Sequence, residues 1–455
     1  MISNIFTTSY KTEEITPQIA VKFAAKFLQE DFPRLKKFED YYRGNHAISY
    51  RIKEPNLSNI KIITNYAAYI SNFTSAYLVG EPVSYTAPDN VNIEQILTAL
   101  KKADSSTQDN DLALDIAIYG RGNELVYMSS DEKPLPKLAR LSPLCAFVVY
   151  DDTVEQKPIF GVYWHAFTDE NNSKRYKVSV YTAYKEFRFM SDENFGIIGD
   201  VTEIPHSFGV VPLIEYYNNG QRGGDFEQVT SLIDAYNLLQ SDRINDKEQF
   251  VNALLALKGV TLGDSNDEAI ERIQALKDMG ILELPGDGAD AAFLTRQFDE
   301  NSIETLRMSI VNDIHKISCV PDMSDKNFAA NVSGVAMKFK LIGLEQLTKT
   351  KERYFAEGLR YRLKAIQNIL TVKGSATVDT EEIKITFKRS LPVNAIEEAQ
   401  EVNLLSGQVP QRLLLSRLSF VEDVEGAIAE LEKEKQADIK NQQSMFMNTP
   451  INFNE

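Results

Sequence analysis

The clearest pattern of apolar and polar positions lies in the second half of the chain and predicts three long helices. Apolar residues recur every three or four positions over 226–257, 301–319 and 333–370. A segment of Gly, Asp and short apolar runs, 259–299, separates the first two helices, and a polar loop, 322–331, separates the last two. This half of the chain is therefore expected to be mainly helical, with one small insert.

The second of these helices carries a continuous apolar stripe. Its members step by three or four residues and are Ile303, Leu306, Ile310, Ile314 and Ile317. Such spacing predicts one apolar face packed against neighbouring helices. An ordinary core helix fits the stripe as well as a contact between subunits does.

The third helix is predicted to be unusually long. Ser333 can cap its start, and at ~1.5 Å per residue it would measure on the order of 55 Å. A helix of that length is uncommon in a single-domain enzyme. Two helices with an insert, a loop and a longer helix suit a ring subunit whose helices line a tunnel.

The first half of the chain reads as helices followed by antiparallel sheet, which makes the fold class α+β. Four helices are expected, at 17–42, 65–78, 91–102 and 109–119. Six strands rich in Val, Tyr and Phe are expected, at 124–128, 146–150, 160–166, 176–182, 186–190 and 211–217. Clusters of Asp, Asn, Gly and Pro separate the strands, as in hairpins.

The last part of the chain predicts one more strand and short helices. The strand at 383–387 is expected to return to the first-half sheet, and helices are expected at 395–405, 411–418 and 421–439. The tail from residue 441 is expected to be disordered, because Met and Phe stand there among Asn and Gln.

Composition narrows the function classes. The chain has 49 Lys and Arg against 65 Asp and Glu, a net charge of −16. This balance argues against a protein that grips nucleic acid by neutralising phosphates, but not against a conduit through which DNA slides. Two isolated cysteines, Cys145 and Cys319, predict no disulfide framework and a reducing, intracellular setting. We expect neither a secretory signal nor a membrane span.

Motifs for covalent chemistry are absent from the sequence. No phosphate-binding Gly-Lys-Ser/Thr loop occurs, and the Gly-x-Gly-x-x-Ala match at 286–291 reads as a tight turn before a strand. His315 and Cys319 have metal-ligand spacing, but two ligands do not make a site, and a packed histidine is the better interpretation. The acidic clusters, 151–152, 264–268 and 287–290, read as solvated turns. We predict no catalytic residue, no metal and no cofactor.

Several segments, in their order along the chain, resemble portal proteins of tailed bacteriophages, of the long-tailed siphophage, head-to-tail connector type. The early matches are Tyr41-Tyr42-Arg43-Gly44-Asn45-His46, the helix from Asn65 to Gly80-Glu81-Pro82-Val83, and Ala117-Ile118-Tyr119-Gly120 with Glu124-Leu125-Val126-Tyr127. The later ones are Ser231 to Asn237, Ser241-Asp242-Arg243, Asp246 to Gly259, and Leu413 to Leu431 with Phe420-Val421-Glu422-Asp423.

The resemblance implies a multi-part ring subunit with an α/β wing, a helical stem, a small α/β clip, a long core helix and a helical crown. The implied parts are the wing at 1–224, stem helix 1 at 225–258, the clip at 259–299, stem helix 2 at 300–320, the tunnel loop at 321–333, the core helix at 334–372, a wing return strand at 373–394, the crown at 395–440 and the tail at 441–455.

The resemblance also implies partners and a location. Twelve copies would form a closed ring at one capsid vertex, through which double-stranded DNA passes without sequence specificity during packaging and ejection. The expected partners are the terminase large subunit, a head-completion or adaptor protein, and the major capsid and scaffold proteins. The ring would belong to the virion and would assemble in the host cytoplasm, with ATP hydrolysis left to the motor.

Three sets of site residues follow from the resemblance. The tunnel loop would place at the narrowest part of the channel Asp322, Ser324, Lys326, Asn327, Phe328 and Asn331. Docking at the clip would use its acidic residues Asp264, Asp267, Glu268, Glu271, Asp287 and Asp290, through electrostatic complementarity. Contacts around the ring would use the stem stripe Ile303, Leu306, Ile310, Ile314 and Ile317.

Two other functions remain possible from the residues alone. An intracellular α+β enzyme with a helical cap domain would need a compact polar constellation, which the sequence does not reveal. A cytoskeletal or scaffold protein could pair through the long helix from Ser333, but that helix lacks a clean heptad repeat.

Overall fold

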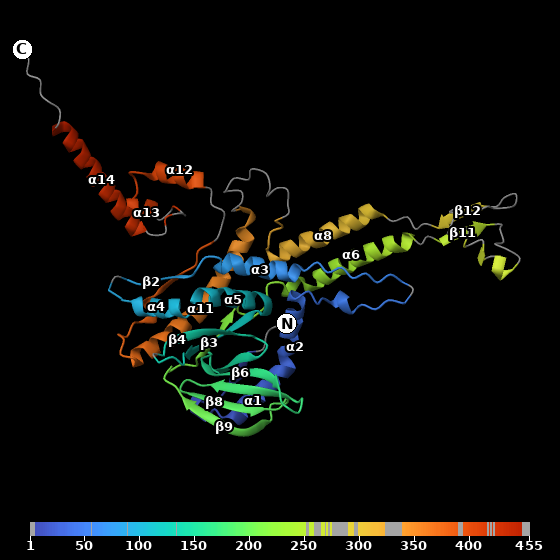
Figure 1. Cartoon of the computed structure of the whole chain (residues 1–455), viewed down its shortest axis with the longest axis horizontal. Coiled ribbons are helices and arrows are strands. Elements are labelled where there is room, and N and C mark those ends of the chain that lie inside the picture. Colours follow the sequence, from blue (N-terminus) through green and yellow to red (C-terminus); the bar gives the residue numbers. More distant parts are fainter. Residues whose placement is uncertain are drawn as a thin grey trace, which may run out of the picture. The chain divides into compact units, whose positions relative to one another are not determined.

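The chain divides into two units, one formed by residues 1–321 and 343–389 and the other by 322–342 and 390–455. The computed structural model describes residues 5–55, 57–88, 90–132, 134–251, 254–258, 265–268, 270–271, 274, 290–294, 299–323, 339–389, 395–415, 418, 421 and 424–447. The first unit contains both sheets of the expected wing and the long helices (Figure 1).

Five helices open the first unit. They are α1 (Pro17–Glu30), α2 (Phe32–Tyr42), α3 (Tyr66–Val79), α4 (Glu94–Lys102) and α5 (Ser105–Tyr119). The prediction of a single helix over 17–42 is wrong, because the helix is interrupted at Asp31. Pro33 lacks the N–H that would continue α1, so it starts a new helix instead. Asn65 caps α3, its Oδ1 accepting the amide of Ala68 at 3.0 Å.

The main sheet has six strands in the order β1-β5-β6-β7-β8-β9. Their bounds are β1 (Phe6–Thr8), β5 (Ala146–Asp151), β6 (Pro158–Thr168), β7 (Lys174–Tyr181), β8 (Lys185–Ser191) and β9 (Ile197–Pro205). The β1–β5 pair is parallel and the others are antiparallel hairpin neighbours. Helix α1 packs on this sheet, with the Phe27 ring stacked on Phe147 at 5.0 Å and edge-on to Trp164.

A second sheet, in the order β10-β3-β4, carries the core against the long helix. It consists of β3 (Arg121–Met128), β4 (Pro136–Leu141) and β10 (Leu213–Tyr217). Helix α11 (Ile342–Val372) buries Phe355, Leu359 and Leu363 in one apolar cluster with α4, α5 and this sheet. The long core helix is thereby confirmed from residue 342, whereas its expected cap, Ser333, lies outside the described residues.

The expected strand near residue 385 forms, but with a different partner. Strand β13 (Lys384–Thr386) pairs antiparallel with β2 (Ser84–Thr86) and makes a separate two-stranded sheet. The expected return to the main sheet is therefore wrong. Ile385 lies opposite Tyr85, and both rest on the cluster that α11 buries, so apolar packing explains the pairing.

The first stem helix is shorter than predicted. After a 3-10 turn (Glu227–Val229), α6 covers Thr230–Val251, and β11 (Leu254–Lys258) follows, paired antiparallel with β12 (Asp290–Leu294). The prediction of helix up to residue 257 is wrong because a short continuous apolar run does not distinguish helix from strand. Pairing with β12 supplies the backbone hydrogen bonds that make residues 254–258 a strand.

The second unit is helical where it is described. It contains α12 (Ala395–Leu405), α13 (Gln411–Leu415) and α14 (Val424–Met447), so the helices expected for a crown are present, with α13 shorter than predicted. The disordered tail expected from residue 441 is wrong as far as Met447, which ends α14. No Gly or Pro stands between residues 427 and 447, so the sequence gives no signal to stop the helix earlier.

Candidate assembly site

Helices α6 and α8 (Glu300–Ser318) lie side by side and form a helical hairpin (Figure 1). Asp299 caps α8 by accepting the amide of Ser302 at 3.1 Å. Ile233 of α6 and Ile314 of α8 are fully buried. The helix predicted over 301–319 is confirmed, with bounds that differ by one residue at each end.

Ion pairs align the two helices of the hairpin. Arg243 Nε lies 2.8 Å from Glu300 Oε1, and its Nη1 lies 3.0 Å from Glu304 Oε2. Arg307 reaches Glu304 from within α8 at 2.6 Å. Arg243 lowers the pKa of Glu300, while Arg307 and then Arg243 lower the pKa of Glu304. Because the groups are open to solvent, the pairs fix register more than they add stability.

A segment that we call the arm (residues 47–55 and 57–64) runs along α6 (Figure 1). Three buried side chains of α6 accept backbone amides of the arm: Asn237 from Thr64, Ser241 from Ile62 and Asn245 from Ile60, at 2.9, 2.9 and 2.7 Å. Four helical residues rise ~6 Å and two extended residues ~6.6 Å, so the spacings match. We call these three side chains the polar ladder.

Further bonds hold the base and the far part of the arm. The Asn237 oxygen is occupied by the arm, so its amide nitrogen, a donor only, faces His46 Nδ1 at 2.8 Å. His46 must then carry its proton on Nε2, which lies 2.9 Å from the Tyr41 carbonyl oxygen. Asp242 pairs with Arg51 at 2.6 Å and with Lys53 at 3.1 Å. The arm is therefore attached along its length.

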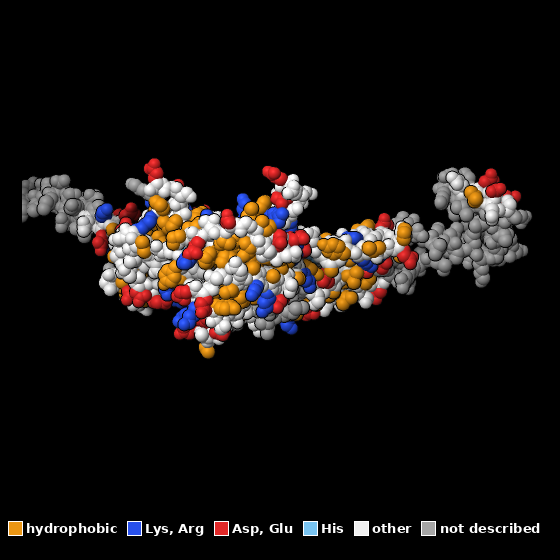
Figure 2. Space-filling view, turned by 90° about the horizontal axis from the view of Figure 1, so that it is seen from below, with side chains coloured by type: hydrophobic (Ala, Val, Ile, Leu, Met, Phe, Trp, Pro, Cys, Tyr) orange, Lys and Arg blue, Asp and Glu red, His pale blue; other side chains and the backbone are white. Residues whose placement is uncertain are grey.

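Apolar side chains gather on the exposed side of the arm. Ile52 is 91% exposed, and the other large exposed residues of the arm are Tyr50, Leu57, Ile60 and Ile63. Single exposed apolar residues are ordinary, but a group on one short segment marks an interaction surface. On the face drawn in Figure 2, acidic and basic side chains are interspersed with apolar patches.

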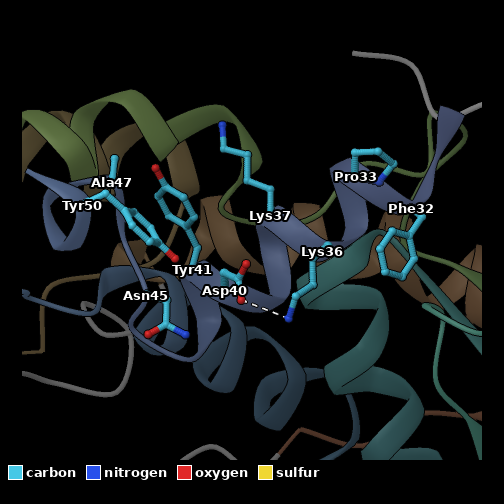
Figure 3. A pocket seen from close by; sticks show the side chains of 9 residues that line it. All are labelled: Phe32, Pro33, Lys36, Lys37, Asp40, Tyr41, Asn45, Ala47 and Tyr50. Carbon is cyan, nitrogen blue, oxygen red and sulfur yellow. Dashed lines mark ion pairs between the residues drawn. The ribbon is translucent and has the colours of Figure 1, made fainter. Parts of the chain in front are cut away.

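A shallow groove of about 460 Å³ lies where the arm leaves α2 (Figure 3). Lys36 is held by Asp40 at 3.1 Å, and the Lys37 ammonium lies 5.5 Å from the centre of the Tyr41 ring. The groove is lined by Phe32, Pro33, Lys36, Lys37, Asp40, Tyr41, Asn45, Ala47 and Tyr50. Its lining contains no nucleophile with a base and no facing pair of carboxylates, so it offers a contact surface and no reaction.

Two buried cations of α11 form ion pairs with carboxylates elsewhere in the first unit. Lys351 contacts Asp225, which also accepts from Asn218 at 2.8 Å. Arg362, fully buried, makes two bonds to Glu124, at 2.7 and 2.9 Å, and lies 2.7 Å from Asp109. The cations are eleven residues apart, about three turns, and so share one face of the helix.

The buried carboxylates differ in how their surroundings act on them. Burial raises the pKa of Asp109 to about 6, even though Arg362 acts in the opposite direction. Burial also acts to raise the pKa of Glu215, but Arg222 and Arg121 outweigh it and hold that pKa below its ordinary value. Asp109 therefore gains a proton more readily than Glu215 does.

The five residues predicted to form stem contacts differ in how exposed they are. Leu306 and Ile317 are 52% and 47% exposed, and Ile303 and Ile310 are half-buried. Ile314 does not belong with them. It is fully buried in the single chain, so it offers the least surface of the five to a neighbouring subunit.

Most residues predicted for the tunnel loop and the clip lie outside the described residues. Asp322 is described, whereas Ser324, Lys326, Asn327, Phe328 and Asn331 lie outside the described residues. In the clip, Asp267, Glu268 and Glu271 are exposed, Asp290 begins β12, and Asp264 and Asp287 lie outside the described residues. The Gly-x-Gly motif at 286–291 is described only from Asp290, which with Ala291 belongs to β12.

The polar ladder is what sequence reasoning missed. Its signal is Asn, Ser and Asn at i, i+4 and i+8 of α6, a polar face on a helix expected to be apolar inside. The buried Lys351 and Arg362 were missed for a similar reason, since charged residues on a long helix are read as solvated.

The described residues were compared with the requirements of a metal site and of a membrane-spanning helix. Within the described residues, no three His, Cys, Asp or Glu side chains come together in a way that could bind a metal ion. His315 instead packs edge-on to Tyr66 and Tyr69, with its Nδ1 2.9 Å from the Val320 carbonyl oxygen, as the packed interpretation predicts. Across the same part of the chain, no helix combines the length and apolar character needed to cross a bilayer.

Comparison with known protein families shows which family the chain belongs to. Residues 23–441 match the family described as "Phage portal protein, SPP1 Gp6-like". The chain belongs to this family of phage portal proteins. Membership makes it a structural component of a phage capsid and not an enzyme, in agreement with the resemblance seen in the sequence.

Two curated portal proteins are similar to this chain. The portal protein of Clostridium phage phiCD119 is 26% identical over 228 residues, 49% of this chain and 48% of that protein. The portal protein of Bacillus phage SPP1 is 22% identical over 375 residues, 79% of this chain and 73% of that protein. The alignment thus spans about half the length of the first relative and most of the second.

Solved structures with a similar outline come from gene transfer agent (GTA) particles. One is the neck of an empty particle, with 11% identity, a TM-score of 0.48, and coverage of 78% of this chain and 90% of that one. Another is the neck of a native particle computed with C12 symmetry, with 12% identity, a TM-score of 0.47, and coverage of 78% and 89%. Likeness of this degree does not fix the number of copies of this portal protein.

Proposed function

We propose that the chain is the subunit of a closed ring of twelve copies at one vertex of a phage capsid, through which double-stranded DNA is packaged and later ejected. The family match over residues 23–441 carries this proposal. The exposed apolar side chains on α8 and on the arm support it, because both surfaces lack a partner within the described part of the chain.

The parts of the subunit take the roles expected of a portal. The sheets and helices of 1–224 form the wing, the α6–α8 hairpin forms the stem, and the β11–β12 pair belongs to the clip. The tunnel loop brings Asp322, Ser324, Lys326, Asn327, Phe328 and Asn331 to the narrowest part of the channel. The helices from α12 to α14 form the crown.

Partner docking is proposed at the clip. Asp267, Glu268 and Glu271 are exposed there and give it a negative surface. A basic patch on the terminase large subunit, and later on a head-completion protein, would be attracted to that surface and oriented by it. The major capsid and scaffold proteins would contact the ring from outside, and ATP hydrolysis would belong to the motor.

The charge of the subunit suits passage of DNA better than binding. Each chain carries a net charge of −16, so a ring repels the phosphate backbone over most of its surface. Tight binding requires the release of counterions by clustered Lys and Arg. A channel with few such clusters holds DNA weakly and lets it slide.

Native mass spectrometry of the purified full chain, with negative-stain images of the same sample, tests the proposal. A closed ring of twelve copies with a central hole is the expected result, because a heterologous contact closes only at a fixed rotation. A closed ring of another size would still support a portal subunit and would change only the proposed number of copies. A compact monomer or dimer that binds a small molecule would contradict the proposal and favour an enzyme.

A further inference from the structure

The arm, α6 and α8 form a strip with α6 in the middle. The polar ladder faces the arm, and Arg243 faces Glu300 and Glu304 of α8. Ser241 and Arg243 are two residues apart, so they point about 200° apart around the helix. The arm and α8 therefore lie on opposite sides of α6, and each forms one edge of the strip.

The outer edge on the α8 side carries exposed apolar residues and two charged ones, Asp313 and Lys316. Val311 is buried and lies two turns after Glu304, on the face of α8 that meets Arg243 of α6. Leu306, Asp313 and Ile317 lie roughly 200–240° around the helix from Val311, on the side facing away from α6. All three are exposed, and the distance along the helix from Leu306 to Ile317 is about 17 Å.

The outer edge on the arm side has the matching character. Ile60 and Ile63 are exposed on the arm, and because side chains alternate along extended chain, Ile63 lies on the face of Lys61 and Ile60 on the other. Lys61, also exposed, lies among them and donates to the Ser49 carbonyl oxygen at 2.6 Å. Within the described part of the chain, no ion pair is formed by Lys61 or by Asp313.

Contacts around a closed ring of identical subunits join two different surfaces of the chain, one on each side. The strip presents two such surfaces, at opposite edges, both with exposed apolar residues; Lys61 lies on one and Asp313 on the other. We propose that the arm of one copy packs along the α8 edge of the next copy, with Lys61 facing Asp313. This inference rests on the proposed ring, and its occupant is a second copy of this chain.

Cross-linking between subunits tests the contact. Cys145→Ala and Cys319→Asn remove the native thiols; Asn suits position 319 because that residue has a φ of 58°. In this background, Lys61→Cys and Asp313→Cys are introduced into one full-length chain. A short bismaleimide should then give a ladder of covalent multimers in denaturing gels.

Single-cysteine chains provide the control. An equal mixture of the Lys61→Cys chain and the Asp313→Cys chain should give dimers and nothing larger, because each subunit then offers only one half of the contact. A chain with Val154→Cys in place of Lys61→Cys, also fully exposed but on the β5–β6 turn, should give no ladder with Asp313→Cys. Multimers from that chain would contradict the assigned surface.

Charge reversal provides an independent readout. Lys61→Glu or Asp313→Lys alone should reduce the fraction of chains found in rings, and the double variant should restore it. Rings that form normally but give no ladder and no charge rescue would overturn the arm contact and leave the proposed ring intact. Chains that never assemble, with native residues at both positions, would count against the ring and the contact together.

Discussion

Single buried residues determine how the long helix sits on the wing. Arg362 is enclosed by Glu124 and Asp109, and Lys351 by Asp225, so α11 cannot slide by a turn without leaving a buried charge unpaired. Removing one partner of a buried pair typically costs about 3–5 kcal/mol. At this scale the sequence is a poor guide, because an Arg on a long helix looks the same whether it faces water or a buried carboxylate.

A glycine on α11 gives a first prediction. A Cβ at Gly358 would lie 2.4 Å from the Tyr216 ring, so Gly358→Ala should lower the free energy of unfolding by about 1–3 kcal/mol. Gly343→Ala on the same helix is the matched control: its Cβ would meet nothing closer than 3.8 Å. That variant should be neutral or stabilising, because alanine favours helix. Denaturant unfolding measures both, and equal effects would contradict the steric account.

Asp109 gives a prediction about pH. Its pKa is raised to about 6 in the folded chain, so the folded state binds a proton more tightly than the unfolded state does. The stability from this group is present below the unfolded pKa, near 4, and is lost as the pH rises through 6. The wild type should therefore lose up to about 3 kcal/mol relative to Asp109→Asn between pH 4 and 7.

Denaturant titrations at four or five pH values measure this difference. Asp152→Asn, on an exposed turn, is the control and should differ from the wild type by the same amount at every pH. If the gap between the wild type and Asp109→Asn stayed constant or widened with pH, the raised pKa would be refuted.

At the scale of elements, the sequence predicted those with a strong period and missed those without one. The helices α3 and α8 have caps, periodicity and clear stops, and both formed close to their expected bounds. Strands β1, β4 and β9 were missed, because β1 has only three residues and β9 is largely exposed. The run Leu254-Leu255-Ala256-Leu257 is apolar at every position, and only a distant partner, β12, makes it a strand.

The polar ladder gives a prediction at the same scale. Asn245→Ala removes the acceptor of the Ile60 amide, so hydrogen exchange at Ile60 should become markedly faster. Exchange at Thr64, which is bonded to Asn237, should change much less. Exchange measured by mass spectrometry with residue-level fragmentation distinguishes the two sites.

Leu238→Ala on α6 serves as a control for the general effect of a substitution on the helix, because Leu238 is exposed and is not part of the ladder. It should leave exchange at Ile60 unchanged. Uniform acceleration along the arm in both variants would mean that the ladder bonds do not act individually.

At the scale of the whole molecule, the order of the segments carried the identification. No single motif was specific, yet helices, strands, hairpin insert and long helix in that order matched one family, and the family comparison confirms it. The number of subunits follows from the angle between neighbours, which one chain's sequence does not encode in any local pattern. The roles assigned to the tunnel-loop and clip residues therefore stay predictions, and a structure of the assembled ring would test them.

The manner in which α6 holds the arm has a consequence for how this chain can diverge. At residues 60, 62 and 64 the helix recognises main-chain amides, which every residue except proline possesses. Selection can therefore replace the outward side chains of the arm one by one without loosening its attachment. Two phage lineages could keep the same α6–α8 hairpin and yet have arms that no longer fit each other's subunits. In a mixed infection, each ring would then contain subunits of one lineage only.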